Sequence, residues 1–461
     1  MGVVCFGAFM GQLDASIVTL TFRPVEREFG TPLAAVQWVS LAYLLVLVAL
    51  LTPAGRIADA IGRKLVYGYG FAVFTVGSAA CAFAPSLGVL VACRVLQAVG
   101  AAMLQANSVG LVATSAPPGR MRLGLSIQAA AQAIGLGLGP TLGGLLTQTV
   151  GWRAVYWINV PVGCLAIVAG RYLLPRTAAC CQSTTFDWPG AALLGVFSGT
   201  LLVALSVVGG LPAPAWLGGL MAGIAVAAAV AFAVRQRKAR HPVIPHELAR
   251  SARITLGLAG ALLGYLVLFG PLVLVPQLLA GHGSVVRTGL ILSALPAGFG
   301  IAALTAEAVL PPGLRNRTRG IIGAAACAAV MVMLLFMSSS LIGIVVLLGL
   351  AGLSLGILVP ANNALIMRTG SASSAGTLGG LVNMARGIGT TLGIALVTLA
   401  LHVSGSAGGG RRPDGTLAFA MLASACACAA VIALAIRPLP GPPGGQAPAE
   451  TAAREASGAF S

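Results

Sequence analysis

The 461-residue sequence predicts an all-α membrane protein that crosses the bilayer many times, and its composition and apolar runs support this fold class. Hydrophobic residues make up 58% of the chain, only 8% of residues are charged, and the mean hydropathy is +0.97. A soluble globular domain carries about 25% charged residues, so this chain has too little charge to cover a water-facing surface. Its apolar residues also gather into runs of about 20 residues, which is the length that crosses a bilayer core.

Fourteen such runs are separated by charged or Pro/Gly-rich segments. They lie at residues 2–22, 35–55, 65–84, 86–114, 122–147, 153–174, 189–208, 216–234, 254–279, 288–309, 320–338, 341–363, 376–402 and 417–436. An even number of spans places both termini on one side. Of the 27 basic residues, nineteen lie in even-numbered connections or the C-terminal tail, six lie in odd-numbered connections, and two lie inside helices. Cytoplasmic loops are enriched in Lys and Arg, so we expect both termini in the cytoplasm.

The chain also repeats itself, which predicts two related halves. The string AQAIGLGLGPTLG in the fifth run parallels ARGIGTTLGIALV in the thirteenth, with Gln132 opposite Arg386. Similarity of this kind suits a fold built from two parallel six-helix repeats. The seventh and eighth runs are nearly free of polar residues and are expected to form an inserted, lipid-facing pair. The predicted parts are an N-terminal half at 1–180, the inserted pair with its loops at 181–240, a C-terminal half at 241–440 and a disordered cytoplasmic tail at 441–461.

Composition and residue spacing exclude several classes of function. The net charge of +17 comes mostly from short loops between apolar runs, so it indicates membrane topology rather than nucleic-acid binding. The nine cysteines show no metal-ligand or disulfide spacing, and neither a metal nor a cofactor is expected. The four histidines lie in loops or near a helix end and lack the spacing of a metalloprotease. Because two carboxylates cannot meet within the membrane either, an enzyme is not expected.

Four motifs occur in order along the chain. LDASIVT surrounds Asp14 in the first run, GRIADAIGRK follows the second, RVLQAVGAA begins at Arg94 in the fourth, and GLGLGPTLGG lies in the fifth. Together they resemble the major facilitator superfamily, and specifically its fourteen-helix drug/proton antiporters. WRAVYWINVPVG near the sixth run and FDWPG before the seventh resemble signatures of the same subgroup. The resemblance extends from the first run to the last.

The resemblance implies a fold of 6 + 2 + 6 helices and a function. A transporter of this kind works as a monomer in the bacterial cytoplasmic membrane and exports a small organic compound, such as a drug or antibiotic, in exchange for protons. Its partners are the substrate, protons and the lipid bilayer. The alternative within transporters is a proton-coupled importer or a facilitator of one metabolite, although the fifth-run motif, typical of antiporters, argues against uptake.

Asp14 is unexpected in an apolar run, because an ionised carboxylate at the bilayer centre costs about 2.5–3.5 kcal/mol on insertion scales. At 1.5 Å per residue, Asp14 lies about 13 Å below the outer surface and Arg94 about 12 Å below it. In the resembled fold both helices line the central cavity, so we expect a contact, direct or through water. The hypothesis is that Asp14 is the proton-coupling site and Arg94 tunes it. The alternative is a static pair that helps two helices pack.

The resemblance assigns other roles to the second and fourth motifs. The loop motif matches at Gly55, Asp59, Gly62, Arg63 and Lys64. In the family it forms a charged latch against the other half, in which Asp59 locks and Arg63 is its partner. The alternative is a charge cluster at a helix end that only enforces topology.

The antiporter motif of the fifth run matches at Gly135, Gly139, Pro140, Gly143 and Gly144. Its glycines permit close helix packing, and Pro140 can kink the helix. We expect this motif to shape the interface that moves between conformations.

Further polar residues fall on helix faces at helical spacing. The candidates for lining a central cavity are Gln97, Gln105, Gln128, Gln132, Asn383 and Arg386. They either line a water-filled path or make the interhelical hydrogen bonds of any bundle. One deep acid and two deep arginines disfavour dicationic substrates, so a neutral, zwitterionic or anionic substrate fits better, and monovalent cations remain compatible. Glu307 is expected at the membrane interface, close to Arg315.

Overall fold

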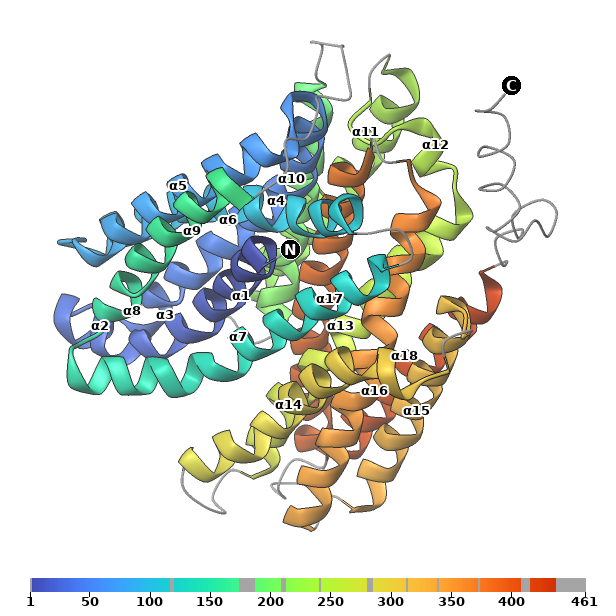
Figure 1. The fold of residues 1–461 in the computed structure, drawn as a ribbon. Coiled ribbons are helices and arrows are strands. Elements are labelled where there is room, and N and C mark those ends of the chain that lie inside the picture. The colour runs from blue at the N-terminus through green and yellow to red at the C-terminus, as the bar shows by residue number, and fades with distance from the viewer. Residues whose placement is uncertain are drawn as a thin grey trace, which may run out of the picture.

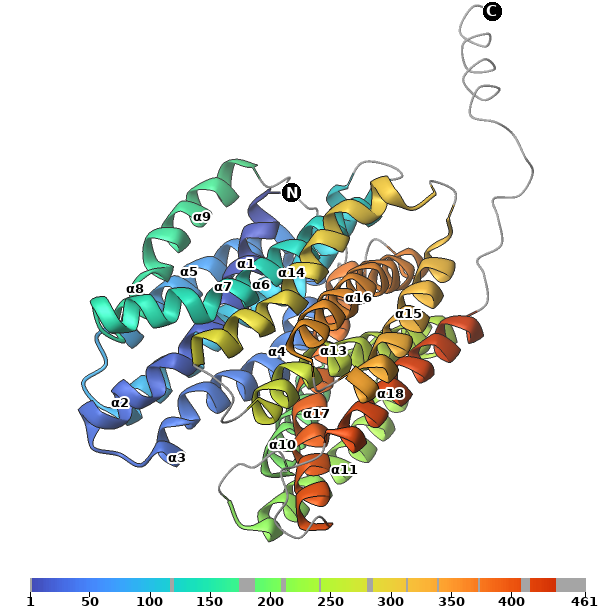
Figure 2. The ribbon, with the colours of Figure 1, turned by 90° about the horizontal axis from the view of Figure 1, so that it is seen from below.

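The structure is a computed structural model. It describes residues 2–116, 120–173, 187–208, 213–239, 242–279, 285–311, 314–337, 340–371, 374–407 and 415–436. The regular elements within these ranges are helices, arranged as two bundles that lie side by side (Figures 1 and 2). The predicted tail at 441–461 lies outside the described residues.

The first bundle contains the elements up to residue 173. They are α1 (Gly2–Ile17), the 3-10 turn η1 (Val18–Thr21), α2 (Phe22–Phe29), α3 (Leu33–Val36), α4 (Trp38–Ile61), α5 (Arg63–Ala82), α6 (Leu87–Ser115), α7 (Met121–Thr149), α8 (Ala154–Trp157) and α9 (Asn159–Leu173). A buried apolar cluster built mainly from α1, α4, α5 and α6 forms its core.

The remaining elements form an inserted pair and the second bundle. They are α10 (Trp188–Val208), α11 (Ala215–Lys238), α12 (His246–Ala249), α13 (Ala252–Leu278), α14 (Val285–Val309), α15 (Asn316–Met337), α16 (Leu341–Thr369), α17 (Ala375–Ala407) and α18 (Thr416–Ala435). A second apolar cluster joins α13 to α18 and takes in Ala129, Ala130 and Ala133 of α7. The two cores therefore meet where α7 packs against α14 and α16.

Among the described residues, thirteen helices are long and apolar enough to cross a membrane, and the count rises to fourteen if the bent pair of α1 and α2 is one span. The sequence predicted one unbroken helix at 2–22, but α1 ends at Ile17 and the axis turns by 56° into α2. The segment FRPVEREF of α2 carries four charged residues, which the bilayer core disfavours. Glu28 of α2 accepts hydrogen bonds from Trp152 Nε1 and Arg153 Nη1, each at 2.6 Å, and this contact holds the bent segment against the turn that leads into α8.

The inserted pair is attached to the first bundle and the second at once. α10 packs against α11 on one side and against α4 and α17 on the other. Asp187, just before α10, accepts from Arg235 of α11 at 3.0 Å and from the backbone N–H of Gly190 at 3.1 Å. α11 is mostly uncovered by protein, and Trp216 is 68% exposed. Such an apolar surface requires lipid rather than water around it.

Candidate functional site

Asp14 and Arg94 form an ion pair inside the first bundle. Asp14 lies on α1 and Arg94 on α6, eighty positions away in the sequence, and Arg94 Nη1 is 2.8 Å from Asp14 Oδ2. Both side chains are withdrawn from the surface, with 0% of Asp14 and 1% of Arg94 exposed. The contact expected from their equal depth is therefore present, and it is direct.

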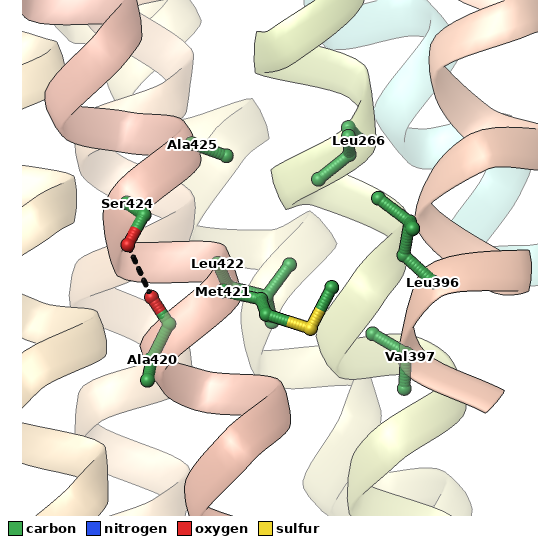
Figure 3. Close-up of a pocket in the computed structure, with 8 residues that line it drawn as sticks. All are labelled: Leu266, Leu396, Val397, Ala420, Met421, Leu422, Ser424 and Ala425. Atoms are coloured by element: carbon green, nitrogen blue, oxygen red, sulfur yellow. Dashed lines mark hydrogen bonds between the residues drawn. The ribbon is translucent and has the colours of Figure 1, made fainter. Parts of the chain in front are cut away.

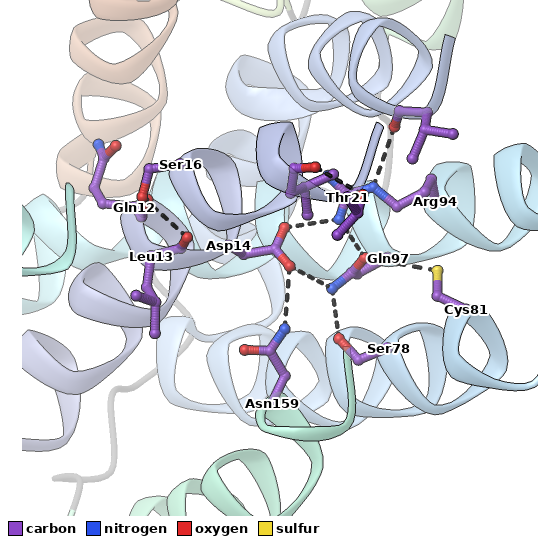
Figure 4. A network of polar contacts seen from close by, with 12 residues as sticks. Gln12, Leu13, Asp14, Ser16, Thr21, Ser78, Cys81, Arg94, Gln97 and Asn159 are labelled. Atoms are coloured by element: carbon purple, nitrogen blue, oxygen red, sulfur yellow. Dashed lines mark hydrogen bonds and ion pairs between the residues drawn. The ribbon is translucent and has the colours of Figure 1, made fainter. Parts of the chain in front are cut away.

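The second carboxylate oxygen of Asp14 is also bonded. Asp14 Oδ1 accepts from Gln97 Nε2 at 3.0 Å and from Asn159 Nδ2 at 3.1 Å. Gln97 Nε2 in addition donates to Ser78 Oγ. Figure 4 shows Asp14 at the centre of this network, with Arg94, Gln97 and Asn159 directed toward its carboxylate. Four helices thus meet at one acid: α1, α5, α6 and α9.

Arg94 is equally well supplied with partners. Its Nε donates to the Val39 carbonyl at 3.2 Å, and its Nη1 donates to Gln97 Oε1 at 2.6 Å as well as to Asp14. The guanidinium carbon lies 4.1 Å from the centre of the Tyr43 ring, within the range of a cation–π contact. Positive and negative charge are therefore balanced inside the network.

The network has a chemical consequence for a proton that reaches Asp14. An ionised carboxylate only accepts hydrogen bonds, and both oxygens of Asp14 are occupied by N–H donors. A protonated carboxyl group carries an O–H donor in place of an acceptor site. Protonation therefore weakens these bonds and removes the negative charge that balances Arg94, so this cluster offers a way to convert proton uptake into a change of helix contacts.

The glycines of the fifth-run motif bring α7 against the helix that carries Asp14. A Cβ added at Gly135 would lie 2.5 Å from the carbonyl oxygen of Phe9, and one at Gly143 would lie 2.8 Å from the side chain of Ile17. A Cβ at Gly139 would meet the side chain of Ser16. A Cβ at Gly144, by contrast, would meet only the side chain of Leu20, at an ordinary contact distance of 4.0 Å. Three glycines four residues apart therefore form the contact surface for α1, and α7 is helical throughout, position 140 included.

Asp59 joins the first bundle to the second. Its Oδ1 accepts from the backbone N–H of Gly376 at 2.8 Å, and its Oδ2 accepts from the N–H and the hydroxyl of Thr377, each at 2.7 Å. These groups begin α17, where backbone N–H groups lack helical partners and negative charge is favourable. Arg63 binds the same carboxylate, with Nε at 2.9 Å and Nη2 at 2.7 Å. Asp59 thus links Arg63 directly to the first turn of α17 in the structure.

The remaining loop-motif residues support this contact. A Cβ at Gly55 would collide with the carbonyl oxygen of Gly376, so this close backbone approach requires glycine. Gly62 ends α4 with a φ of 109°, a conformation that favours glycine. Lys64 Nζ donates to the carbonyl of Arg171 at 3.0 Å, which ties the motif to the end of α9.

A second charged contact between the bundles was not predicted. Glu307 near the end of α14 binds Arg122 of α7 through both carboxylate oxygens and lies 3.4 Å from Arg319 of α15. Arg122 also donates to Asn316 Oδ1 at 3.0 Å. The sequence placed Glu307 close to Arg315, but its ion-pair partners are the other two arginines. The sequence feature that could have indicated this contact is the presence of an acid and several arginines near one helix end.

The other candidate residues form two hydrogen-bonded groups, one that contains Gln128 and one around Arg386. Gln128 of α7 donates to Ser108 of α6 at 2.8 Å. Arg386 and Asn383 of α17 lie together, with Arg386 Nη1 donating to Asn383 Oδ1 at 2.7 Å, and Asn383 Nδ2 donating to the carbonyl of Gln105 of α6 at 2.7 Å. In this conformation these polar residues bond helices to one another.

The side chain of Gln132 joins the group around Arg386. Tyr265 of α13 donates from its hydroxyl to Gln132 Oε1 of α7 at 3.5 Å, and its ring centre lies 4.4 Å from the guanidinium carbon of Arg386. This Arg386 cluster therefore combines residues of α7 and α6 with residues of α13 and α17.

An apolar cavity of about 300 Å³ lies apart from these polar groups, between α13, α17 and α18 (Figure 3). Its lining is aliphatic side chains, Met421 and Ser424, whose hydroxyl bonds to the carbonyl of Ala420 in its own helix at 2.8 Å. The cavity offers no charged group to a polar ligand.

Comparisons with known proteins identify the family. The family model described as Major Facilitator Superfamily matches residues 4–180 and 188–394. The chain is 29% identical over 444 residues to the Methylenomycin A resistance protein of Bacillus subtilis (strain 168), covering 93% of this chain and 92% of that protein. It is 36% identical over 259 residues to the Tetracenomycin C resistance and export protein of Streptomyces glaucescens. That alignment covers 55% of this chain and 47% of the relative, so it spans about half the relative's length.

Comparison with solved structures shows a related fold. The crystal structure of the human organic anion transporter MFSD10 (TETRAN) resembles this chain with a TM-score of 0.66 at 16% identity, covering 94% of this chain and 98% of that chain. At this identity the likeness concerns the fold alone. With 13 or 14 candidate spans, the fold and the family match together make the protein a multi-pass membrane transporter rather than an enzyme. The chain belongs to the major facilitator superfamily.

Proposed function

We propose that the protein exports a small organic compound, such as a drug or antibiotic, across the bacterial cytoplasmic membrane in exchange for protons. The observation that carries this proposal is the ion pair of Asp14 and Arg94, fully buried at 0% and 1% exposure within a membrane-spanning bundle. A charged residue at such a depth is costly and usually functional. The names of the two relatives, a resistance protein and a resistance and export protein, support the outward direction.

In this proposal Asp14 is the proton carrier and Arg94 its counter-ion. When Asp14 accepts a proton, its charge-assisted bond to Arg94 becomes a weaker neutral one. Because α1 contacts α7 through the glycine stripe, a change in the position of α1 is passed to the helix that packs on α14 and α16. Proton uptake at one acid thereby alters the surface between the bundles.

The latch of Asp59 holds one of the two access routes closed. The distribution of basic residues among the loops predicts that the end of α4 and the start of α17 lie on the cytoplasmic side. A closed latch therefore corresponds to a transporter shut toward the cytoplasm. Substrate entry requires the Asp59 bonds to Gly376 and Thr377 to break. Alternating access then consists of opening this latch while the outer ends of the bundles approach each other.

The experiment that tests the proposal uses inverted membrane vesicles with an imposed pH gradient. Methylenomycin A and tetracenomycin C serve as probes, since relatives carry these compounds in their names. Wild-type vesicles are expected to accumulate at least one probe and to dissipate the gradient when it is added. Asp14→Asn keeps the shape of the side chain but cannot be ionised, so it should abolish both signals.

Glu26→Gln is the matched control, since it removes a carboxylate whose side chain is 27% exposed on α2. This variant should transport as the wild type does. Concentrative, proton-dependent export by Asp14→Asn would refute the role of Asp14. A wild type that moves a probe down its gradient without moving protons would refute antiport and favour a facilitator.

A further inference from the structure

Arg386 is a deeply placed cation without an acidic partner among the described residues. Seven ion pairs are present in that part of the chain, and none includes Arg386. Its side chain is nevertheless buried, with 5% of the residue exposed. Arg386 lies about 16 Å along α17 from Ala375 at 1.5 Å per residue, which is near the middle of a bilayer core of about 30 Å.

The hydrogen bonds of Arg386 are incomplete. Its Nη1 donates to Asn383, and its guanidinium lies over the ring of Tyr265, but its Nε is buried without a hydrogen-bond partner. The Nε of Arg94, in contrast, has the Val39 carbonyl, and the Arg94 charge has Asp14. A buried donor left without a partner costs about 1–3 kcal/mol. An unpaired cation with a free donor is therefore a feature that a bound anion would complete.

The Arg386 cluster also lies where a transported ligand must be held. Asn383 bonds to α6 and Tyr265 bonds to α7, so both bundles contribute to it. Substrate sites in transporters built from repeats lie near the bilayer midplane between the repeats. The apolar cavity beside α18 lacks both properties, because it is lined by α13, α17 and α18 alone and carries no charge.

We infer that Arg386 binds an anionic group of the transported compound, a carboxylate, with Asn383 and Tyr265 positioning the guanidinium. This inference rests on the proposed function and specifies the substrate class of that transporter. A planar guanidinium presents paired N–H donors that match a carboxylate. Tyr265 adds an apolar face beside the charge, which suits an organic anion better than a strongly hydrated inorganic one.

Binding of two matched probes to the purified full-length protein in detergent tests the inference. 1-Naphthoate carries a carboxylate, and 1-naphthamide has nearly the same shape without the charge. At constant ionic strength, the wild type should bind naphthoate about tenfold or more tightly than naphthamide, since hydrogen bonds to charged groups exceed neutral ones. Equal affinity of the wild type for both probes would overturn the inference whatever the variants do.

Two substitutions and one control locate the site. Arg386→Gln should remove the preference for naphthoate, and Arg386→Lys should keep the preference at reduced affinity because the charge remains while the forked geometry is lost. Arg368→Gln changes an exposed arginine at the end of α16 and should bind as the wild type does. A preference retained in Arg386→Gln overturns the inference. If that variant does not fold, undiminished naphthoate affinity in Arg386→Lys overturns it instead.

The binding assay contains neither a membrane nor a gradient, so it separates this inference from the proposed function. Naphthoate preference without proton-coupled export in vesicles would leave the anion site standing and refute antiport. Proton-coupled export by a protein that shows no preference for naphthoate would refute the anion site and leave antiport standing.

Discussion

The two bundles differ in how their buried charged side chains are paired. The first contains two buried acids, and each has an arginine partner: Asp14 with Arg94, and Asp59 with Arg63. The described part of the second bundle offers backbone N–H groups at the start of α17 and the cation of Arg386, but its acid Glu307 is 24% exposed in its side chain and lies at a helix end. The first bundle balances its deep charge internally, whereas the second leaves one deep charge to be balanced by something else.

This difference indicates a division of work. A carboxylate can gain and lose a proton, whereas an arginine guanidinium stays charged under all ordinary conditions. The bundle that contains Asp14 therefore suits proton handling. The bundle that contains Arg386 suits recognition of a group whose charge comes from outside the protein.

The largest expected effect is a difference in stability loss between substitutions of the two deep arginines, Arg94 and Arg386. Arg94→Gln leaves Asp14 buried without its counter-ion, and breaking a buried pair in this way costs about 3–5 kcal/mol. Arg386→Gln leaves no buried acid behind and should cost clearly less. Thermal unfolding in mild detergent measures both, and Asp14→Asn combined with Arg94→Gln should recover part of the loss. Equal losses in the two single variants would contradict the comparison.

The second-largest expected effect concerns Asp59, whose carboxylate binds the start of α17. Asp59→Asn should speed hydrogen exchange at the N–H groups of Gly376 and Thr377 by roughly ten- to a hundredfold, since a hydrogen bond to a charged group contributes about 1.5–3 kcal/mol. Mass spectrometry of the peptide that begins α17 measures this rate. Exchange at Arg386, nine residues beyond Thr377, should change far less. Unchanged rates at both amides would show that the latch does not hold the start of α17.

A third effect tests how α1 delivers Asp14 to its partners. Gly139→Ala places a Cβ against Ser16, and overpacking of this kind costs about 1–3 kcal/mol. Gly144→Ala is the control in the same motif, because its Cβ would make only an ordinary contact with Leu20, at 4.0 Å. The unfolding temperature and proton-coupled transport should both fall in the first variant only. Similar behaviour of the two variants would remove the glycine stripe from the explanation.

The smallest effect sharpens the description of the Arg386 cluster. Tyr265→Phe keeps the ring beneath the guanidinium and removes only a long 3.5 Å hydrogen bond to Gln132. Tyr265→Leu removes the cation–π contact as well, which contributes about 0.5–2 kcal/mol. Naphthoate affinity should be nearly unchanged in the first variant and several-fold weaker in the second. Loss of affinity in Tyr265→Phe would assign the positioning role to the hydroxyl instead.

Much of the fold and part of the site could be predicted from the sequence, because depth along a helix can be counted. The spans follow from apolar length, and the contact of Asp14 with Arg94 follows from two helices with charges at one level. Asp59 with Arg63 follows from a spacing of four residues. These predictions use distances along one helix or along the membrane normal, which residue numbers supply directly.

What was missed depends on how helices are rotated and packed. Asn159 stands within the quoted string WRAVYWINVPVG, yet nothing in that string shows that its amide reaches Asp14 on α1. The Asp59 bond to Gly376 joins residues 317 positions apart, and the Glu307 partner Arg122 lies 185 positions away. The bend after Ile17 arises because the charged segment of α2 leaves the apolar layer, a boundary that hydropathy alone places poorly.

The isolated charge of Arg386 has an electrical consequence. While Asp14 is ionised, its pair with Arg94 carries no net charge through the membrane field. An uncompensated guanidinium that changes its position relative to the field does carry charge, and a full crossing changes the energy by about 2.3 kcal/mol per 100 mV. A bound anion cancels that charge. If Arg386 binds the transported anion as proposed, the step that returns without an anion is the one that membrane voltage governs most, and the step loaded with an anion is nearly independent of voltage.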